Sequence, residues 1–335
     1  MKIIKPSHQH MKHDGLTPQQ FIEIIGRTCY KSTDKITDDS AEKFVNNLTK
    51  RKHWAMLEHE TIYLRLPSVQ IRRMVTEFGT ENGQKSKYIT TKFLNITYND
   101  GNDKGIISGS IRSFYDLIKT NSVCSLVLIC IANELKKAYP WAYKDTLDIQ
   151  IDNFDFEIEI LTRDNFIEMY KDNNDILSRH LIHTVKFVCD RGVSHELVRH
   201  RPVSFAQEST RYCNYSKDKF GREITVIEPI FYVENAYKCD KSTNKTVYDI
   251  WKESCEFAEK SYFKLLDLGS TPQEARDVLP NSLKTEIIMT ATEEEWQHII
   301  NLRAKGTTGQ PHPQMVEIME PWYEELKEIT NNRVN

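Results

Sequence analysis

The sequence predicts a protein of mixed helices and strands, because two kinds of periodicity occur along it. Capping boxes, in which a threonine is followed three residues later by glutamine or glutamate, predict helix starts at Thr17, Thr271 and Thr292. Alternation of apolar and polar residues predicts a strand over 60–66, which Pro67 closes. Apolar residues make up 39% of the chain, which is enough for a sizeable core.

The remaining elements follow from the same rules. Further helices are expected over 39–52, within 110–139 and over 245–268, where Gly269 ends the helix, and the helix from Thr271 should end near Pro280. Further strands are expected within 147–161 and over 180–189, 224–233 and 284–291. The stretch 79–109 is polar and contains glycine, and no catalytic pattern is visible between 68 and 179.

Composition narrows the class of protein. A net charge of −3 over 335 residues gives no general reason to expect nucleic acid or an anionic membrane as partner. The seven cysteines include no Cys-x-x-Cys pair, so neither a disulfide framework nor a thiolate zinc site is indicated. The N-terminal residues are polar, and the longest apolar run, 126–132, is too short to span a bilayer. We therefore expect a soluble cytoplasmic protein.

The most informative segment is Arg199-His200-Arg201, followed after seven residues by Ser209-Thr210-Arg211-Tyr212. Adjacent arginines can hold a phosphate from several sides through bidentate, charge-assisted bonds. If 207–211 is extended, Gln207, Ser209 and Arg211 share one face and form a second anion pocket. The same arginines could instead lie on a solvated surface or pair with nearby acidic residues.

The spacing of this segment resembles the signature of the flavin-dependent thymidylate synthases, which is Arg-His-Arg, seven residues, then Ser. Other segments resemble further elements of that family in the same order. They are 25–30, His53 with 57–59, 275–280 and 301–304. The resemblance covers roughly 17–66 and 180–325.

The resemblance implies an α+β fold, a twisted and largely antiparallel sheet flanked by helices, assembled as a homotetramer with shared active sites. Residues 1–67 and 180–330 are expected to form the catalytic domain. Residues 68–179 are then an inserted helical and strand subdomain of unknown role.

The resemblance also implies the activity, which is reductive methylation of dUMP to dTMP. Methylenetetrahydrofolate is the expected carbon donor, FAD the hydride carrier and NADPH or NADH the reductant. No metal, nucleic-acid or membrane partner is expected. None of the seven cysteines is expected to act as a nucleophile, and Cys213 is interpreted as an ordinary buried thiol.

Site residues are carried over from the family position by position. The expected cofactor-binding residues are His53, Arg199, His200, Arg201, Gln207, Thr292 and His298. The expected substrate-binding residues are Glu196, Arg199, Gln207, Glu208, Ser209, Thr210, Arg211, Arg276 and Arg303.

Arg303 is the expected catalytic residue. A fixed guanidinium beside a developing ring anion favours loss of the uracil ring proton between the two carbonyls. On the predicted helix, Arg303 continues an apolar stripe formed by Trp296, Ile299 and Ile300. Judged on its residues alone, the same arginine could simply satisfy the last carbonyls of the helix.

The chain departs from the family pattern at several of these positions. Glu196 stands where many members have glutamine, and Gln207 stands where some have glutamate. Thr292 replaces an asparagine near the flavin, and Ala55 replaces a threonine beside the cofactor in some relatives.

Two other classes of protein are weighed against this interpretation. His180, His183, His195 and His200 lie close in sequence and could be metal ligands, although His180 and His183 would fall on opposite faces of a strand. Alternatively, Arg199, Arg201 and Arg211 with Phe205 and Tyr212 could bind nucleic acid, although the chain is acidic and has no broader basic stripe.

Overall fold

A computed structural model describes residues 1–77, 94–121, 125–146, 149, 151, 154–211 and 213–332 of the chain. Tyr212 of the signature segment and part of the polar stretch 79–109 lie outside the described residues. The chain forms helices together with mostly antiparallel sheets, so the predicted α+β class is confirmed.

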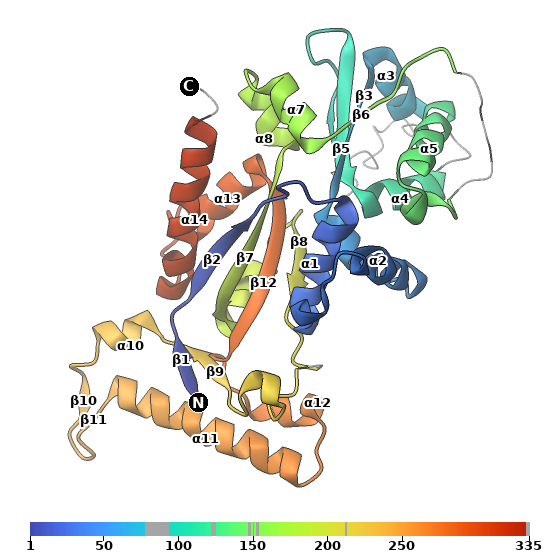
Figure 1. The fold of residues 1–335 in the computed structure, drawn as a ribbon. Coiled ribbons are helices and arrows are strands. Elements are labelled where there is room, and N and C mark those ends of the chain that lie inside the picture. Colours follow the sequence, from blue (N-terminus) through green and yellow to red (C-terminus); the bar gives the residue numbers. More distant parts are fainter. Residues whose placement is uncertain are drawn as a thin grey trace.

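Four strands form the central sheet of the molecule, with the order β2, β7, β12 and β8 (Figure 1). These strands are β2 (Ser7–Met11), β7 (Ile182–Asp190), β8 (Ser204–Gln207) and β12 (Lys284–Thr292). Each neighbouring pair is antiparallel. β12 pairs with β7 along its whole length, from Lys284 opposite Asp190 to Thr292 opposite Ile182.

Helices cover both faces of this sheet because its side chains alternate. Alternate buried residues of β7 and β12, among them Phe187 and Met289, pack against α9 (Arg191–Leu197), α13 (Glu293–Arg303) and α14 (Pro313–Asn331). Ala206 and Ile288 belong instead to the core on the opposite face. The elements there are α1 (Pro18–Tyr30), α2 (Ser40–Lys50) and the 3₁₀ turn η2 (Trp54–His59).

The segment 68–179 follows β3 (Thr61–Pro67) and forms most of a second four-stranded sheet, with the order β4, β5, β3 and β6. Its own strands are β4 (Leu94–Thr97), β5 (Lys104–Ser110) and β6 (Glu159–Leu161). Its helices are α3 (Ser68–Glu77), α4 (Ile111–Asn121), α5 (Leu126–Ala138), α6 (Pro140–Tyr143) and α7 (Arg163–Tyr170), with α8 (Asn174–His180) leading back to β7. We refer to 68–179, the segment that the sequence predicts to be an insertion, as the inserted region.

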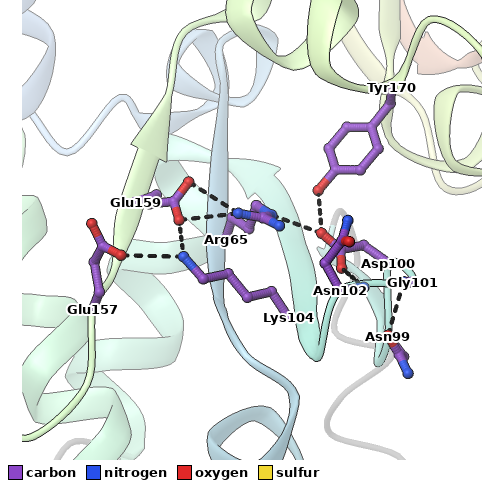
Figure 2. Close-up of polar contacts among 9 residues, drawn as sticks. All are labelled: Arg65, Asn99, Asp100, Gly101, Asn102, Lys104, Glu157, Glu159 and Tyr170. Atoms are coloured by element: carbon purple, nitrogen blue, oxygen red, sulfur yellow. Dashed lines mark hydrogen bonds and ion pairs between the residues drawn. The ribbon is translucent and has the colours of Figure 1, made fainter.

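Ion pairs connect the strands of this second sheet (Figure 2). Arg65 of β3 contacts Asp100 at 2.7 Å and Glu159 of β6 at 3.1 Å. Lys104 of β5 contacts Glu159 as well, and Tyr170 donates a hydrogen bond to Asp100 at 2.8 Å. We call these residues, together with Glu157, the Arg65 network.

The inserted region shares a core with the flanking segments. One cluster of buried residues runs from Ile25 of α1 through Leu64 of β3 to Phe114 of α4 and Ile131 of α5, and it includes Ile288 of the central sheet. The second sheet is therefore packed onto the first by apolar contact.

The other end of the central sheet is covered by shorter strands and one long helix (Figure 1). The strands are β1 (Lys2–Ile4), which pairs in parallel with β9 (Thr225–Ile227), and β10 (Cys239–Asp240), which pairs with β11 (Lys245–Thr246). The helices are α10 (Ile230–Glu234), α11 (Val247–Asp267), α12 (Pro272–Ala275) and the 3₁₀ turns η1 (Thr33–Lys35), η4 (Asp218–Phe220) and η5 (Arg276–Val278).

The capping signals place the helix starts correctly. Thr17 and Thr271 form complete capping boxes with Gln20 and Glu274, and Thr292 accepts a hydrogen bond from the Glu295 backbone. Gly269 ends α11 with a φ of +94°, a backbone conformation that glycine adopts without strain. The predicted helices over 39–52 and 245–268 and the strand over 284–291 are confirmed within a few residues. The helical stretch predicted within 110–139 forms two helices, α4 and α5.

Three strand predictions need correction. His180 is the last residue of α8, so the strand begins only at Ile182. Strand β9 ends at Ile227, and 230–233 is helical because Pro229 stands before the first turn of α10. Of the predicted strand within 147–161, the described residues form one only over Glu159–Leu161. No helix among the described residues is long and apolar enough to cross a membrane.

Candidate active site

The Arg-His-Arg element lies between helix α9 and strand β8, at the edge of the central sheet. Helix α9 begins at Asp190, whose side chain accepts the Val193 amide at 2.7 Å. The helix ends at Leu197, and Arg199 to Pro202 form the turn that leads to β8. In this turn His200 points inward and is 6% exposed, whereas Arg199 and Arg201 are exposed.

Arg303 brings the C-terminal end of α13 to the same place. Its Nε donates to His200 Nε2 at 2.9 Å, and its Nη1 donates to Glu196 Oε2 at 2.7 Å. Trp296, Ile299 and Ile300 are fully buried on the same side of α13, as the apolar stripe predicts. The catalytic residue expected from the sequence therefore lies beside two other expected site residues.

His200 is held in its neutral form. Burial is the largest cause that lowers its pKa, and together with the nearby Arg303 and His298 it brings the pKa to about 4. Because Nε2 accepts the bond from Arg303, the ring proton of neutral His200 is assigned to Nδ1. His200 therefore orients Arg303 as a hydrogen-bond acceptor and adds no positive charge at neutral pH.

Arg199 and Arg201 supply exposed positive charge at this turn. Within the described part of the chain, neither guanidinium has an ion-pair or hydrogen-bond partner. An exposed guanidinium without a carboxylate presents its full set of donors to an incoming anion. These two side chains are the ones in the turn that could hold phosphate groups.

The second half of the signature is more fully engaged in the fold. Gln207 donates to Ser194 Oγ at 2.9 Å and to Thr285 Oγ1 at 3.2 Å. Glu208 is 4% exposed and contacts Lys284 at 2.9 Å and Lys31 at 3.7 Å. These contacts tie the end of β8 to α9, β12 and α1.

The residues that follow form a turn. Strand β8 ends at Gln207, so the extended conformation considered for 207–211 is wrong, and the Cys213 amide donates back to the Ser209 carbonyl at 3.0 Å. Arg276 Nη1 donates to Thr210 Oγ1 at 3.4 Å, and Arg211 Nε donates to Gln273 at 2.9 Å. The turn after β8 is thereby bonded to both ends of α12, through Arg211 to Gln273 within the helix and through Thr210 to Arg276, which follows the helix. Cys213 itself is buried, as predicted.

Two of the expected cofactor residues line a cavity of about 430 Å³. Arg201 and Thr292 lie on its wall, together with Glu58 and Ser204. Thr292 caps α13 at the end of β12, and Ser204 Oγ donates to the Glu58 carbonyl at 3.1 Å. Thr290 also lines the cavity, and its hydroxyl bonds the buried His59 Nδ1 at 2.7 Å.

His53 and His298 stand apart from that cavity. His53 lines a separate cavity of about 530 Å³ beside Tyr30, whose hydroxyl is 3.1 Å from His53 Nδ1. His298 is exposed on α13 and acts electrostatically on His200. The structure thus brings Glu196, His200 and Arg303 together and places Arg201 and Thr292 on one cavity. It leaves Arg211 and Arg276 at α12 and His53 at another opening.

The histidines considered as metal ligands have other contacts. His180 bonds Thr97 and Ser108 at 2.8 Å each, and His183 bonds Glu293 at 2.7 Å. His195 is exposed on α9. Among the described residues, no group of three or more His, Cys, Asp or Glu side chains could hold a metal ion.

Several residues at the site could not be found by reading motifs. Asn95, Ser108 and Ser110 of the inserted region line the cavity with Arg201, and Lys31 and Lys284 balance Glu208. Nothing in their local sequence marks them, because strand pairing and helix packing bring them to the site.

The fold and the site define an α+β protein with a cluster of arginines at one edge of an antiparallel sheet. Residues 162–330 match the model of the family described as thymidylate synthase complementing protein. Because this match covers half of the chain, the chain belongs to that family.

Curated relatives carry the name flavin-dependent thymidylate synthase. The relative from Pyrococcus abyssi is 30% identical over 115 residues, which are 34% of this chain and 43% of that protein. The relative from Sulfurisphaera tokodaii is 31% identical over 150 residues, which are 44% of this chain and 51% of that protein. The chain therefore spans about half the length of the curated relatives that it matches, or less.

Among solved structures, the chain is similar to the UMP/dUMP methylase PolB from Streptomyces cacaoi bound with 5-Br dUMP. The TM-score is 0.39 at 12% identity, over 99% of this chain and 96% of that one. Values this low support no conclusion about function.

Proposed function

We propose that the chain is a flavin-dependent thymidylate synthase, which methylates dUMP to dTMP. Methylenetetrahydrofolate would donate the carbon, FAD would carry the hydride and NADPH or NADH would be the reductant. The enzyme would act as a cytoplasmic homotetramer with shared active sites. The observation that carries the proposal is Arg303, held by Glu196 and His200 beside two exposed arginines that have no counterion among the residues described.

The residues present fit a ligand such as FAD, which has phosphates and a fused ring system. Arg199 and Arg201 offer donors for the phosphates, and Arg201 also borders the cavity of about 430 Å³. Thr292 and Glu58 supply polar groups on the cavity wall. When bound, the flavin would supply the hydride transfer that protein side chains cannot perform.

A nucleotide would be held by the second half of the signature. Arg211 lies on the turn after β8, Arg276 reaches the same turn from the end of α12, and their guanidinium groups would bind the phosphate of dUMP. Ser209 and Thr210 add hydroxyl groups to the same turn. Gln207 and Glu208 are proposed to shape this site through their bonds to Thr285 and Lys284.

Arg303 would act on the pyrimidine ring. Its guanidinium favours the ionised ring because a fixed positive charge stabilises a developing anion most strongly where water is excluded. His200 contributes by orientation, since its neutral ring accepts the Nε–H bond at 2.9 Å. Glu196, at 2.7 Å, fixes the other side of the guanidinium and partly neutralises it. The ring of dUMP would therefore have to share the guanidinium with Glu196.

The test is dTMP formation from dUMP, methylenetetrahydrofolate and NADPH, with and without added FAD. Product that depends on FAD supports the proposal. A folded protein that binds FAD and yields no dTMP would contradict it. The proposed homotetramer is tested separately, by light scattering of the protein as it elutes from a size-exclusion column.

A further inference from the structure

The cavity beside Arg201 has one wall from the inserted region. On the other side, it is lined by the end of β12 and the turn before β8, through Thr292, Pro202 and Ser204. The inserted wall consists of the paired ends of β4 and β5, where Leu94 lies opposite Gly109 and Asn95 lies opposite Ser108. A cavity shared in this way exists only when both regions are folded together.

Contacts hold the inserted wall in place. Arg112, in the first turn of α4, contacts Glu58 at 2.5 Å, and Glu58 itself lines the cavity. Ser110 Oγ lies 2.6 Å from Ser113 Oγ, and Ser108 Oγ lies 2.8 Å from His180 Nδ1. The two serines on the wall therefore already have partners within the protein.

Asn95 differs from those serines. Its side chain is half-buried and lines the cavity, and it has no hydrogen-bond partner among the residues that the structure describes. An amide offers a donor and an acceptor side by side. The other polar groups on the inserted wall already have hydrogen-bond partners. The Asn95 amide can therefore bond a ligand without first breaking a bond in the protein.

The cavity indicates the chemistry of its ligand. Leu94, Ile182 and Ala291 supply apolar wall, and a volume of about 430 Å³ accommodates one fused ring system. Arg201 at the wall would meet a charged group attached to that ring. The ring should also have a polar edge, with acceptor and N–H groups that match the Asn95 amide. The isoalloxazine of a flavin and the pterin of a folate share this chemistry.

We infer that the inserted region is part of the ligand site, with Asn95 forming hydrogen bonds to the polar edge of a fused heteroaromatic ring held between β5 and β12. The inference rests on the proposed function, which supplies two ligands with such a ring. Asn95 is therefore a residue that selects the ligand, at a position that no family motif marks.

The experiment compares Asn95→Leu and the isosteric Asn95→Asp with the full-length wild-type protein. Binding of FAD is measured by quenching of flavin fluorescence, and binding of tetrahydrofolate by calorimetry, each with dUMP present. Asn165→Leu is the matched control, because Asn165 is an exposed asparagine of the same inserted region on α7 and does not line the cavity.

We expect both Asn95 variants to weaken one ligand by about 5- to 100-fold, the range for a lost hydrogen bond that leaves a buried group unpaired. A loss confined to FAD identifies the ring as isoalloxazine, and a loss confined to tetrahydrofolate identifies it as pterin. Wild-type affinity for both ligands in either folded variant overturns the inference while leaving the proposed function intact. A wild-type protein that binds neither ligand overturns both.

Discussion

Two groups of arginines in this molecule have opposite surroundings. Arg65 is enclosed in the Arg65 network, where Asp100 and Glu159 take up its charge (Figure 2). Arg199 and Arg201 are exposed and have no ion-pair partner within the described part of the chain. An arginine whose charge is balanced by carboxylates stabilises the fold, whereas an arginine with free donors can bind an anion. Arg303 lies between these extremes, because it is bonded yet its side chain remains 23% exposed.

The largest effect is expected from breaking the Arg65 network. Arg65→Ala leaves Asp100, whose side chain is 1% exposed, without its cation. Removing one partner of a buried ion pair costs about 3–5 kcal/mol, because the remaining charge is left uncompensated. We expect the free energy of unfolding to fall by that amount in urea titrations.

Arg73→Ala is the control for this prediction. Arg73 also forms an ion pair, with Glu77 at 2.9 Å, but its side chain is 51% exposed. An exposed pair of this kind contributes less than about 0.5 kcal/mol. Equal losses in the two variants would show that burial does not distinguish them.

The comparison also shows what the sequence could and could not predict. The signature of Arg199 to Ser209 is local, so its spacing alone identifies the arginines as candidates for anion binding. The turn that exposes Arg199 and Arg201 is seen only in the structure. The start of α13 could be located in the same way, since Thr292 is a helix cap that acts on its own segment. Signals of this kind depend on neighbours within a few residues.

Contacts between distant segments could not be predicted in this way. The Arg303–His200 bond joins positions 103 residues apart, and only the resemblance to the family suggested that they belong to one site. Asn95 reaches the cavity because β4 pairs with β5, and its own sequence gives no indication of that. The strand prediction is wrong for His180 because only Leu181 separates α8 from β7, and apolar residues lie on both sides of that boundary.

The second prediction concerns Arg303, which is bonded within the protein but remains partly exposed. Arg303→Ala should lower the rate of dTMP formation by about 10²- to 10³-fold, the effect of losing one preorganised charge or donor at a developing anion. The free energy of unfolding should change by less than about 1 kcal/mol, because the ion pair with Glu196 is partly exposed. Turnover and urea titration measure the two effects on the same protein.

Glu196→Gln is the matched control at this pair. Glutamine keeps an oxygen that can accept the Arg303 bond, so turnover should stay within about tenfold of the wild type. Full turnover in Arg303→Ala would remove the catalytic assignment of Arg303.

Lowering the pH should destabilise the surroundings of the cavity and the Arg65 network in two different pH ranges. Burial lowers the pKa of His59, which lies behind the cavity, to about 4. A histidine with a lowered folded pKa binds protons more readily when unfolded, so its stabilising contribution is present above about pH 6.5 and is lost as the pH falls toward 4. In the Arg65 network, bonds from Arg65 and Tyr170 outweigh desolvation and hold the pKa of Asp100 below its ordinary value. Its contribution is lost only at lower pH.

Between pH 6.5 and 4 we therefore expect a loss of up to about 3 kcal/mol from His59, at about 1.4 kcal/mol per pKa unit. His59→Gln should flatten the slope of unfolding free energy against pH in that window. Asp100→Asn should leave the slope there unchanged. If the slope between pH 6.5 and 4 changed in Asp100→Asn and stayed the same in His59→Gln, the assignment of the two pH ranges would be wrong.

The smallest effect is expected at the exposed arginines. Arg199→Ala and Arg201→Ala should each weaken FAD binding by about tenfold, because each removes charge-assisted bonds to a phosphate in a solvated setting. Neither change should alter the free energy of unfolding by more than about 0.5 kcal/mol, since neither guanidinium contacts a carboxylate in the described residues. Arg179→Ala, which removes an exposed arginine paired with Asp175 in the inserted region, should change neither quantity. Stoichiometric FAD retained with wild-type affinity in both variants would mean that a free guanidinium at this turn is only a solvated surface charge. Weaker FAD binding with an unchanged free energy of unfolding would show that Arg199 and Arg201 bind the ligand and do not stabilise the fold. Stabilisation of the fold would then come from enclosed arginines such as Arg65.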